Sequence, residues 1–198
     1  MATLQLDDDG VTRVARQVPS PNQDERPPGT VISLVVVHGI SLPPGCFGTT
    51  HIEALFTNTL DAAQHPYFAT IADLRLSAHF LIGRDGDLVQ FVPCRARAWH
   101  AGISSWSGRE RCNDFSVGVE LEGSDDEPYA AAQYATLSRL VRALLARYPV
   151  TDVVGHSDIA PGRKSDPGPA FDWARLRRGI RAQHVRIGTG IGAGLPQA

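Results

Sequence analysis

Apolar residues along this chain gather into short runs that predict strands. Residues 31–37 form a continuous run rich in Val and Ile, which is the pattern of a strand buried on both faces. Residues 77–83 and 88–92 lie on either side of an Asp-Gly pair, and this arrangement predicts an antiparallel hairpin. Residues 116–123 alternate between apolar side chains and Gly or Glu, which predicts a strand with one apolar face.

Two later segments have the spacing of helices that pack one face on a sheet. Apolar residues recur at steps of three and four from residue 131 to 148, and Pro149 ends that segment. Residues 152–154 predict a short strand, and residues 172–184 predict a last amphipathic helix.

The segments without such a pattern are also informative. Residues 1–30 are polar and Pro-rich, and we expect a leader that wraps over a domain formed by residues 31–184. Residues 40–75 form a long irregular connection with one helical piece near 52–56, and connections of that length are more often functional than idle. The Gly-rich residues 185–198 predict a disordered tail.

Composition excludes several classes of function. The 198 residues are enough for one domain with a core, and 19 basic against 21 acidic residues argue against a nucleic-acid or polybasic membrane binder. The first 30 residues lack the cationic start and apolar segment of a secretory signal, so we expect a cytoplasmic protein. The cysteines, at positions 46, 94 and 112, are odd in number and widely spaced, which predicts free thiols and no thiolate metal site.

A loop near the carboxyl end carries the strongest candidate chemistry. Residues 153–173 contain so many Pro and Gly residues that we expect no helix or strand to run through them. The loop carries His156, Lys164 and Asp166, and an imidazole with a carboxylate could supply two ligands of a metal ion. His38 ends the other strongly apolar run, and we take it as the third ligand.

Other assignments of these residues remain open at this point. A histidine at a strand end is often a hydrogen-bonded structural residue, and Asp166 precedes a proline as turn residues do. His79 and His100 could be ligands as easily; we expect His79 to be structural, and His100 to be either structural or a substrate contact. Trp99 lies with Trp106 in a polar loop, where a sugar or peptide contact and core packing are equally open.

Hydrolysis at a metal site also needs a base and an electrophile. Glu120 lies on the side of its predicted strand opposite the apolar residues, and Glu122 shares that face. Both could equally be solvent-facing carboxylates. Lys164 offers a positive charge suited to stabilising the oxyanion that develops on an attacked carbonyl.

Five stretches together resemble one known family. They are VVVHGISLPPG, SAHFLIGRDGDLVQFVP, RAWHAG, GRERCNDFSVGVELEG and GHSDIAPGRKSDPGPAFDW. In order and spacing they are similar to the zinc-dependent N-acetylmuramoyl-L-alanine amidases, which are related to phage amidases and peptidoglycan recognition proteins. The resemblance is strongest to the cytoplasmic branch that acts on 1,6-anhydro-N-acetylmuramyl-L-alanine. It implies an α/β fold in a single domain, with a mixed central β-sheet flanked by helices.

The resemblance also implies roles for individual residues. Zinc would be held by His38, His156 and Asp166, with Glu120 as the base and Lys164 polarising the carbonyl. The bond cut would join the lactyl group of anhydro-muramic acid to L-alanine in a small muropeptide. Residues implied to bind this substrate are Arg75 and Arg111, through peptide carboxylates, and Trp99, which would face the sugar. A monomer is expected, without a nucleic-acid or membrane partner.

The chain departs from the family pattern at two places. Gly39 stands where an Asn is expected, and residues 130–132 are alanines where a polar helix cap is expected. Two alternative functions remain: an exported amidase acting on intact peptidoglycan, and a non-catalytic peptidoglycan-binding module. Binding modules of this fold typically lack a metal ligand, and all three candidate ligands are present here.

Overall fold

A mixed sheet forms the centre of the molecule in the computed structural model, which describes residues 4–188. Its seven strands lie in the order β1-β5-β4-β9-β3-β10-β11. Every neighbouring pair is parallel except β4 with β5, which pair antiparallel. In sheet order the strands are β1 (Arg16–Gln17), β5 (Leu88–Gln90), β4 (Phe80–Ile82), β9 (Ser116–Glu122), β3 (Leu34–Ile40), β10 (Asp152–Gly155) and β11 (Arg186–Ile187).

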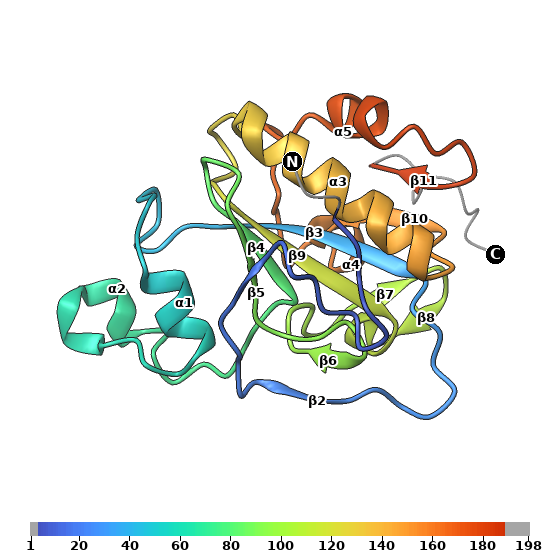
Figure 1. Ribbon diagram of the computed structural model, residues 1–198. Coiled ribbons are helices and arrows are strands. Elements are labelled where there is room, and N and C mark those ends of the chain that lie inside the picture. Colours follow the sequence, from blue (N-terminus) through green and yellow to red (C-terminus); the bar gives the residue numbers. More distant parts are fainter. Residues whose placement is uncertain (1–3, 189–198) are drawn as a thin grey trace.

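Apolar side chains bury both faces of this sheet. The two longest helices of the described chain, α3 (Ala131–Arg147) and α5 (Trp173–Ile180), lie together over one face (Figure 1). The apolar side of β9 belongs to the core cluster that α3 and α5 complete. A second cluster lies beneath α1 (His51–Phe56) and α2 (Pro66–Ala69), which stand to one side of the sheet in Figure 1. None of the helices described is long and apolar enough to cross a membrane.

Smaller elements complete the described chain. Strand β2 (Gln23–Glu25) pairs antiparallel with β6 (Ala96–Ala98), and β7 (Ser105–Trp106) with β8 (Arg109–Glu110). Short helical turns are η1 (Ala62–Gln64), η2 (Cys112–Asp114) and α4 (His156–Ile159). The polar segments expected to be loop or leader therefore contain short strands. Within the expected leader, residues 1–30, strand β1 pairs with the edge of the main sheet, and the side chains of Leu4 and Ala15 belong to the hydrophobic core.

The long periodic elements match their predictions. The hairpin of β4 and β5, the strand β9 and the helix α3 lie where the sequence places them. Helix α3 begins without the polar cap that the family pattern has. Gln133 supplies it from within the helix: its Oε1 accepts from the Ala130 amide at 2.9 Å, and its Nε2 donates to the carbonyls of Ile82 and Glu122.

Four boundaries differ from prediction. The strand expected at 31–37 is Leu34–Ile40, because β9 continues the pairing to Ile40, while Val31 is exposed. The loop expected at 153–173 contains α4, and the helix expected at 172–184 ends at Ile180. The tail expected to be disordered from 185 includes β11, which pairs with β10; residues 189–198 lie outside the described residues.

Candidate active site

Three adjacent parallel strands bring predicted site residues to one edge of the sheet. β3 lies between β9 and β10, and the register pairs His38 with Glu120 and Val37 with Gly155. His156 follows Gly155 directly and begins α4. Carboxyl ends of parallel strands meet at the same edge of a sheet, which is where α/β folds bind ligands. The strand register therefore places His38, Glu120 and His156 side by side.

The three predicted ligands form a small triangle. His38 Nδ1 lies 3.0 Å from His156 Nδ1, and Asp166 Oδ2 lies 3.1 Å from His156 Nδ1 and 3.4 Å from His38 Nδ1. The Ser157 amide donates to the Asp166 carbonyl at 3.0 Å, which ties the ligand loop to α4. All three ligand atoms lie within 4.8 Å of one another, so the group could hold a metal ion.

The protonation states suit metal binding. Burial, together with the nearby His156, lowers the pKa of His38 to about 4, so His38 is neutral at physiological pH. Burial acts to raise the pKa of Asp166, but contacts with His156 and His38 outweigh it and hold that pKa well below its usual range. Neutral imidazoles and an ionised carboxylate are the forms that coordinate metals.

Glu120 is buried beside the triangle. The alternative left open by the sequence, a solvent-facing carboxylate, is therefore excluded for this residue. Its Oε1 lies 3.9 Å from His38 Nδ1, and its Oε2 has no hydrogen-bond partner among residues 4–188. Burial raises the pKa of Glu120, Asp166 raises it further and Lys164 lowers it. A carboxylate with a free oxygen and a raised pKa is suited to accepting a proton.

Glu122 has a different environment, although it also proves to be buried. Its Oε1 accepts from the Gly48 amide at 2.6 Å, and its Oε2 accepts from the Arg84 amide at 3.3 Å. Both carboxylate oxygens are thus used to anchor two loops. The structure therefore leaves Glu120 as the better candidate for the base.

A cleft of about 600 Å³ opens over these residues. Lys164 is exposed at its edge, and its backbone amide donates to the Ala160 carbonyl at 3.1 Å. Trp99 also lines the cleft, whereas Trp106 packs against a small core cluster around β10. One wall of the cleft is formed by Ile40, the last residue of β3, and by the long connection that follows, through Ser41, Leu42, Pro44, Leu55, Tyr67, Ile71 and Leu74.

The two predicted arginines do not line this cleft. Arg75 is exposed between the cleft residues Leu74 and Leu76, and its guanidinium donates to the carbonyls of Ala72 and Leu74. Arg111 is exposed and lines a second cavity of about 550 Å³. That cavity and the cleft share Arg163 as a lining residue.

The competing histidines lie behind the triangle. His79 is fully buried; its Nδ1 accepts from the Gly118 amide at 3.0 Å, and its Nε2 lies 3.2 Å from the Ala96 carbonyl. Burial lowers the pKa of His79 well below 6.5. His100 contacts the ligand His38, with its Nδ1 2.9 Å from His38 Nε2. The contacts of His79 are those of a buried hydrogen-bonded residue, and His100 bonds to the predicted ligand His38, a contact that the sequence did not indicate.

Tyr129 is a further residue that sequence reasoning missed. It is buried, and its hydroxyl donates at 3.0 Å to the carbonyl of Pro167, the residue after the predicted ligand Asp166. Its ring packs over two glycines: a Cβ at Gly39 would lie 2.3 Å from the hydroxyl oxygen, and one at Gly123 2.3 Å from the ring. A side chain at position 39 would therefore collide with Tyr129 as it is packed here.

Comparison with known proteins gives a consistent result. Residues 28–169 match the sequence profile of the N-acetylmuramoyl-L-alanine amidase family. The 1,6-anhydro-N-acetylmuramyl-L-alanine amidase AmpD of Citrobacter freundii is 59% identical over 172 residues, covering 86% of this chain and 92% of the relative.

Solved structures agree with the observed fold. A crystal structure of a Se-Met AmpD derivative superimposes with a TM-score of 0.86 at 57% identity, covering 89% of this chain and 99% of that one. The amidase AmiD from E. coli, in complex with the substrate anhydro-N-acetylmuramic acid-L-Ala-D-gamma-Glu-L-Lys, has a TM-score of 0.56 at 30% identity, over 88% of this chain and 65% of its own. The fold, the site geometry and the extent of these matches show that the chain belongs to the N-acetylmuramoyl-L-alanine amidase family.

Proposed function

We propose that this chain is a zinc-dependent amidase that cleaves the bond between 1,6-anhydro-N-acetylmuramic acid and L-alanine in small muropeptides and releases the stem peptide. The observation that carries the proposal is the triangle of His38, His156 and Asp166 with the unpartnered oxygen of Glu120 beside it. Similarity to AmpD of Citrobacter freundii, at 59% identity over 92% of its length, supports this substrate class.

The spacing of the three ligand atoms fits zinc. Ligands bonded at about 2.0–2.2 Å around a tetrahedral ion lie roughly 3.3 Å from one another. The observed separations of 3.0, 3.1 and 3.4 Å agree with that value. Two imidazoles and a carboxylate leave a fourth position open, as catalytic zinc sites do. When present, zinc supplies a Lewis acid that makes water acidic enough to react near neutral pH and polarises a carbonyl.

The side chains around the triangle account for the proton transfers. Glu120 takes the proton from the attacking water and delivers it to the nitrogen of L-alanine as the amide C–N bond breaks. Its raised pKa suits both steps, because the protonated form must persist until the amine leaves. The Lys164 ammonium at the cleft edge stabilises negative charge on the carbonyl oxygen.

Cleft residues supply the substrate contacts in this proposal. Trp99 lines the cleft and offers an aromatic face to the sugar. Arg75 and Arg111 remain predicted contacts for peptide carboxylates. In support, Arg75 lies between two cleft residues, and Arg111 lines the cavity that shares Arg163 with the cleft. The AmiD complex holds an anhydro-muramyl tripeptide, a ligand of the class proposed here.

We also propose a cytoplasmic monomer. All three cysteines are free thiols, and Cys46 is exposed, as is usual in a reducing compartment. The parallel edge strands β1 and β11 are only two residues long, which gives little backbone for a second copy to pair with. Size-exclusion chromatography with light scattering tests the monomer directly.

The function is tested by incubating the zinc-loaded protein with purified anhydro-muramyl tripeptide and with intact wall sacculi. Mass spectrometry is expected to detect free stem peptide from the muropeptide, at a much higher rate than from sacculi. Comparable rates on the two substrates would favour an amidase of intact peptidoglycan. Binding of the muropeptide without release of peptide would favour a non-catalytic module.

A further inference from the structure

One short segment lies behind both histidine ligands. His38 Nε2 is 2.9 Å from His100 Nδ1, and His156 Nε2 is 3.2 Å from the carbonyl of Ala101, the next residue along the chain. Both ligands turn their Nδ1 atoms to the triangle and their Nε2 atoms to this segment. The inference concerns this pair of contacts and rests on the proposed metal site.

The direction of each hydrogen bond follows from the groups beyond it. A carbonyl only accepts, so His156 must carry its proton on Nε2. The Ser116 hydroxyl has one proton, which it donates to the Cys112 carbonyl at 2.6 Å, so it accepts from His100 Nε2 at 3.1 Å. His100 Nδ1 is then free of a proton and accepts from His38 Nε2.

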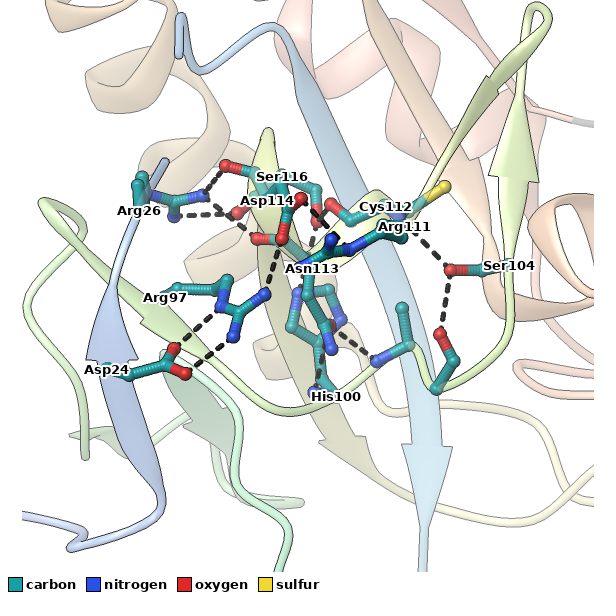
Figure 2. Close-up of polar contacts among 12 residues, drawn as sticks. Asp24, Arg26, Arg97, His100, Ser104, Arg111, Cys112, Asn113, Asp114 and Ser116 are labelled. Atoms are coloured by element: carbon teal, nitrogen blue, oxygen red, sulfur yellow. Dashed lines mark hydrogen bonds and ion pairs between the residues drawn. The ribbon is translucent and has the colours of Figure 1, made fainter. Parts of the chain in front are cut away.

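The same segment is fixed in place from its backbone side. Asn113 Oδ1 accepts from the amides of His100 at 3.1 Å and Ala101 at 2.8 Å. The His100 ring packs against Gly118, where a Cβ would lie 2.4 Å from its Cγ. Figure 2 shows His100, Asn113 and Ser116 in this network, with the half-buried Arg26 donating to the carbonyls of Asn113, Asp114 and Ser116.

We propose that His100 and Asn113 are positioning residues, which hold both histidine ligands as Nε2–H tautomers so that their Nδ1 lone pairs face the metal. His100 acts on His38 through its ring nitrogen. Asn113 acts on both ligands, because it fixes the backbone that carries the His100 ring and the Ala101 carbonyl. Mutation of residues that orient histidine ligands in this way typically weakens metal binding 10- to 100-fold.

Matched variants separate this role from general stability. His100→Phe keeps an aromatic ring of similar size but offers no acceptor to His38. His100→Asn keeps an acceptor near the position of Nδ1. His79→Phe is the control: His79 is fully buried, bonds to Gly118, Ala96 and Arg26, and packs its ring against His100, but it makes no hydrogen bond to the three predicted ligands.

Zinc dissociation constants are measured by competition with a chromophoric chelator. We expect His100→Phe to bind zinc 10- to 100-fold more weakly. His100→Asn is expected to recover most of that loss, and His79→Phe to stay within about threefold of wild type. Equal zinc affinity in His100→Phe and wild type overturns the proposal. Equal losses in His100→Phe and His79→Phe also overturn it, because they indicate a general packing effect.

A spectroscopic measurement on the wild-type protein does not depend on whether a variant folds. In the zinc-loaded, ¹⁵N-histidine-labelled protein, a coupling across the N–H···N hydrogen bond is expected between His38 Nε2 and His100 Nδ1. The proton is expected on His38 Nε2. A proton on His100 Nδ1, or no coupling between the two rings, contradicts the proposal even if the protein is fully active. If the coupling is present but the zinc-loaded wild-type protein releases no stem peptide, the result counts against the proposed function and not against this proposal.

Discussion

The contact between Gly39 and Tyr129 makes a sharp test of how the site is packed. A Cβ placed on Gly39 lies 2.3 Å from the Tyr129 hydroxyl oxygen, about 1 Å short of an ordinary contact. The tyrosine cannot swing away freely, because its hydroxyl donates to the Pro167 carbonyl and its ring is confined over Gly123. Gly39→Ala therefore has to displace a buried side chain.

The expected cost of Gly39→Ala is worked from two effects. Overpacking of a buried site costs about 1–3 kcal/mol. Loss of the Tyr129–Pro167 hydrogen bond adds about 0.5–1.5 kcal/mol, which gives roughly 1.5–4.5 kcal/mol in total. In a Tyr129→Phe background the nearest remaining atoms lie 3.5 Å and 3.6 Å from the new Cβ, which is ordinary contact. There Gly39→Ala should cost less than about 1 kcal/mol, because alanine is also better than glycine in a strand.

Urea unfolding of the four proteins at a fixed zinc concentration measures this difference. Wild type, Gly39→Ala, Tyr129→Phe and the double variant form a double-mutant cycle. A coupling of about 1.5–3 kcal/mol is expected between the two sites. The same cost for Gly39→Ala in both backgrounds, or a cost below about 0.5 kcal/mol in the Tyr129 background, would show that Tyr129 does not exclude a side chain at position 39.

Four further outcomes are expected. Asp166→Ala should lose zinc and turnover together, measured by metal analysis and peptide release; retained stoichiometric zinc contradicts its role. Glu120→Gln should keep zinc and lower kcat by about 10²–10⁴-fold. If this variant also loses zinc, the result counts against the role of Glu120 as the general base. Lys164→Ala should keep zinc and lower kcat by roughly 10²–10³-fold; unchanged kcat argues against oxyanion stabilisation. Burial holds the pKa of His79 well below 6.5, so the unfolded state takes up a proton first as pH falls. The free energy of unfolding should therefore decline below pH 6.5, by up to about 1.4 kcal/mol per pH unit for this group, and less steeply in His79→Gln.

The parts of the fold that were predicted from the sequence have strong local patterns. Helix α3 and strand β9 each repeat their own period over several turns or residues, and the Asp-Gly turn identifies the hairpin of β4 and β5. Predicted strand boundaries that depend on pairing with a neighbouring strand were wrong. The end of β3 is one of these, because its last residues are extended only through pairing with β9.

The same division holds for the site. The candidate residues could be chosen from their residue types alone, because imidazoles, carboxylates and an ammonium group suit metal binding and proton transfer. The structure places all five around one cleft: His38, Glu120, His156, Lys164 and Asp166. What the sequence could not show is which groups face them from other strands. The contact of His100 with His38 requires the space left by Gly118, and the burial of Glu120 requires the paths of the loops above it.

In the proposed function, one zinc ion held by His38, His156 and Asp166 is required for cleavage of the anhydro-muramyl–L-alanine bond. Titration of the chelator-treated protein with zinc, with release of stem peptide as the readout, tests it most directly. We expect activity to rise linearly from near zero and to reach its plateau at one equivalent of zinc. Full activity in a preparation shown by metal analysis to contain no metal would contradict it.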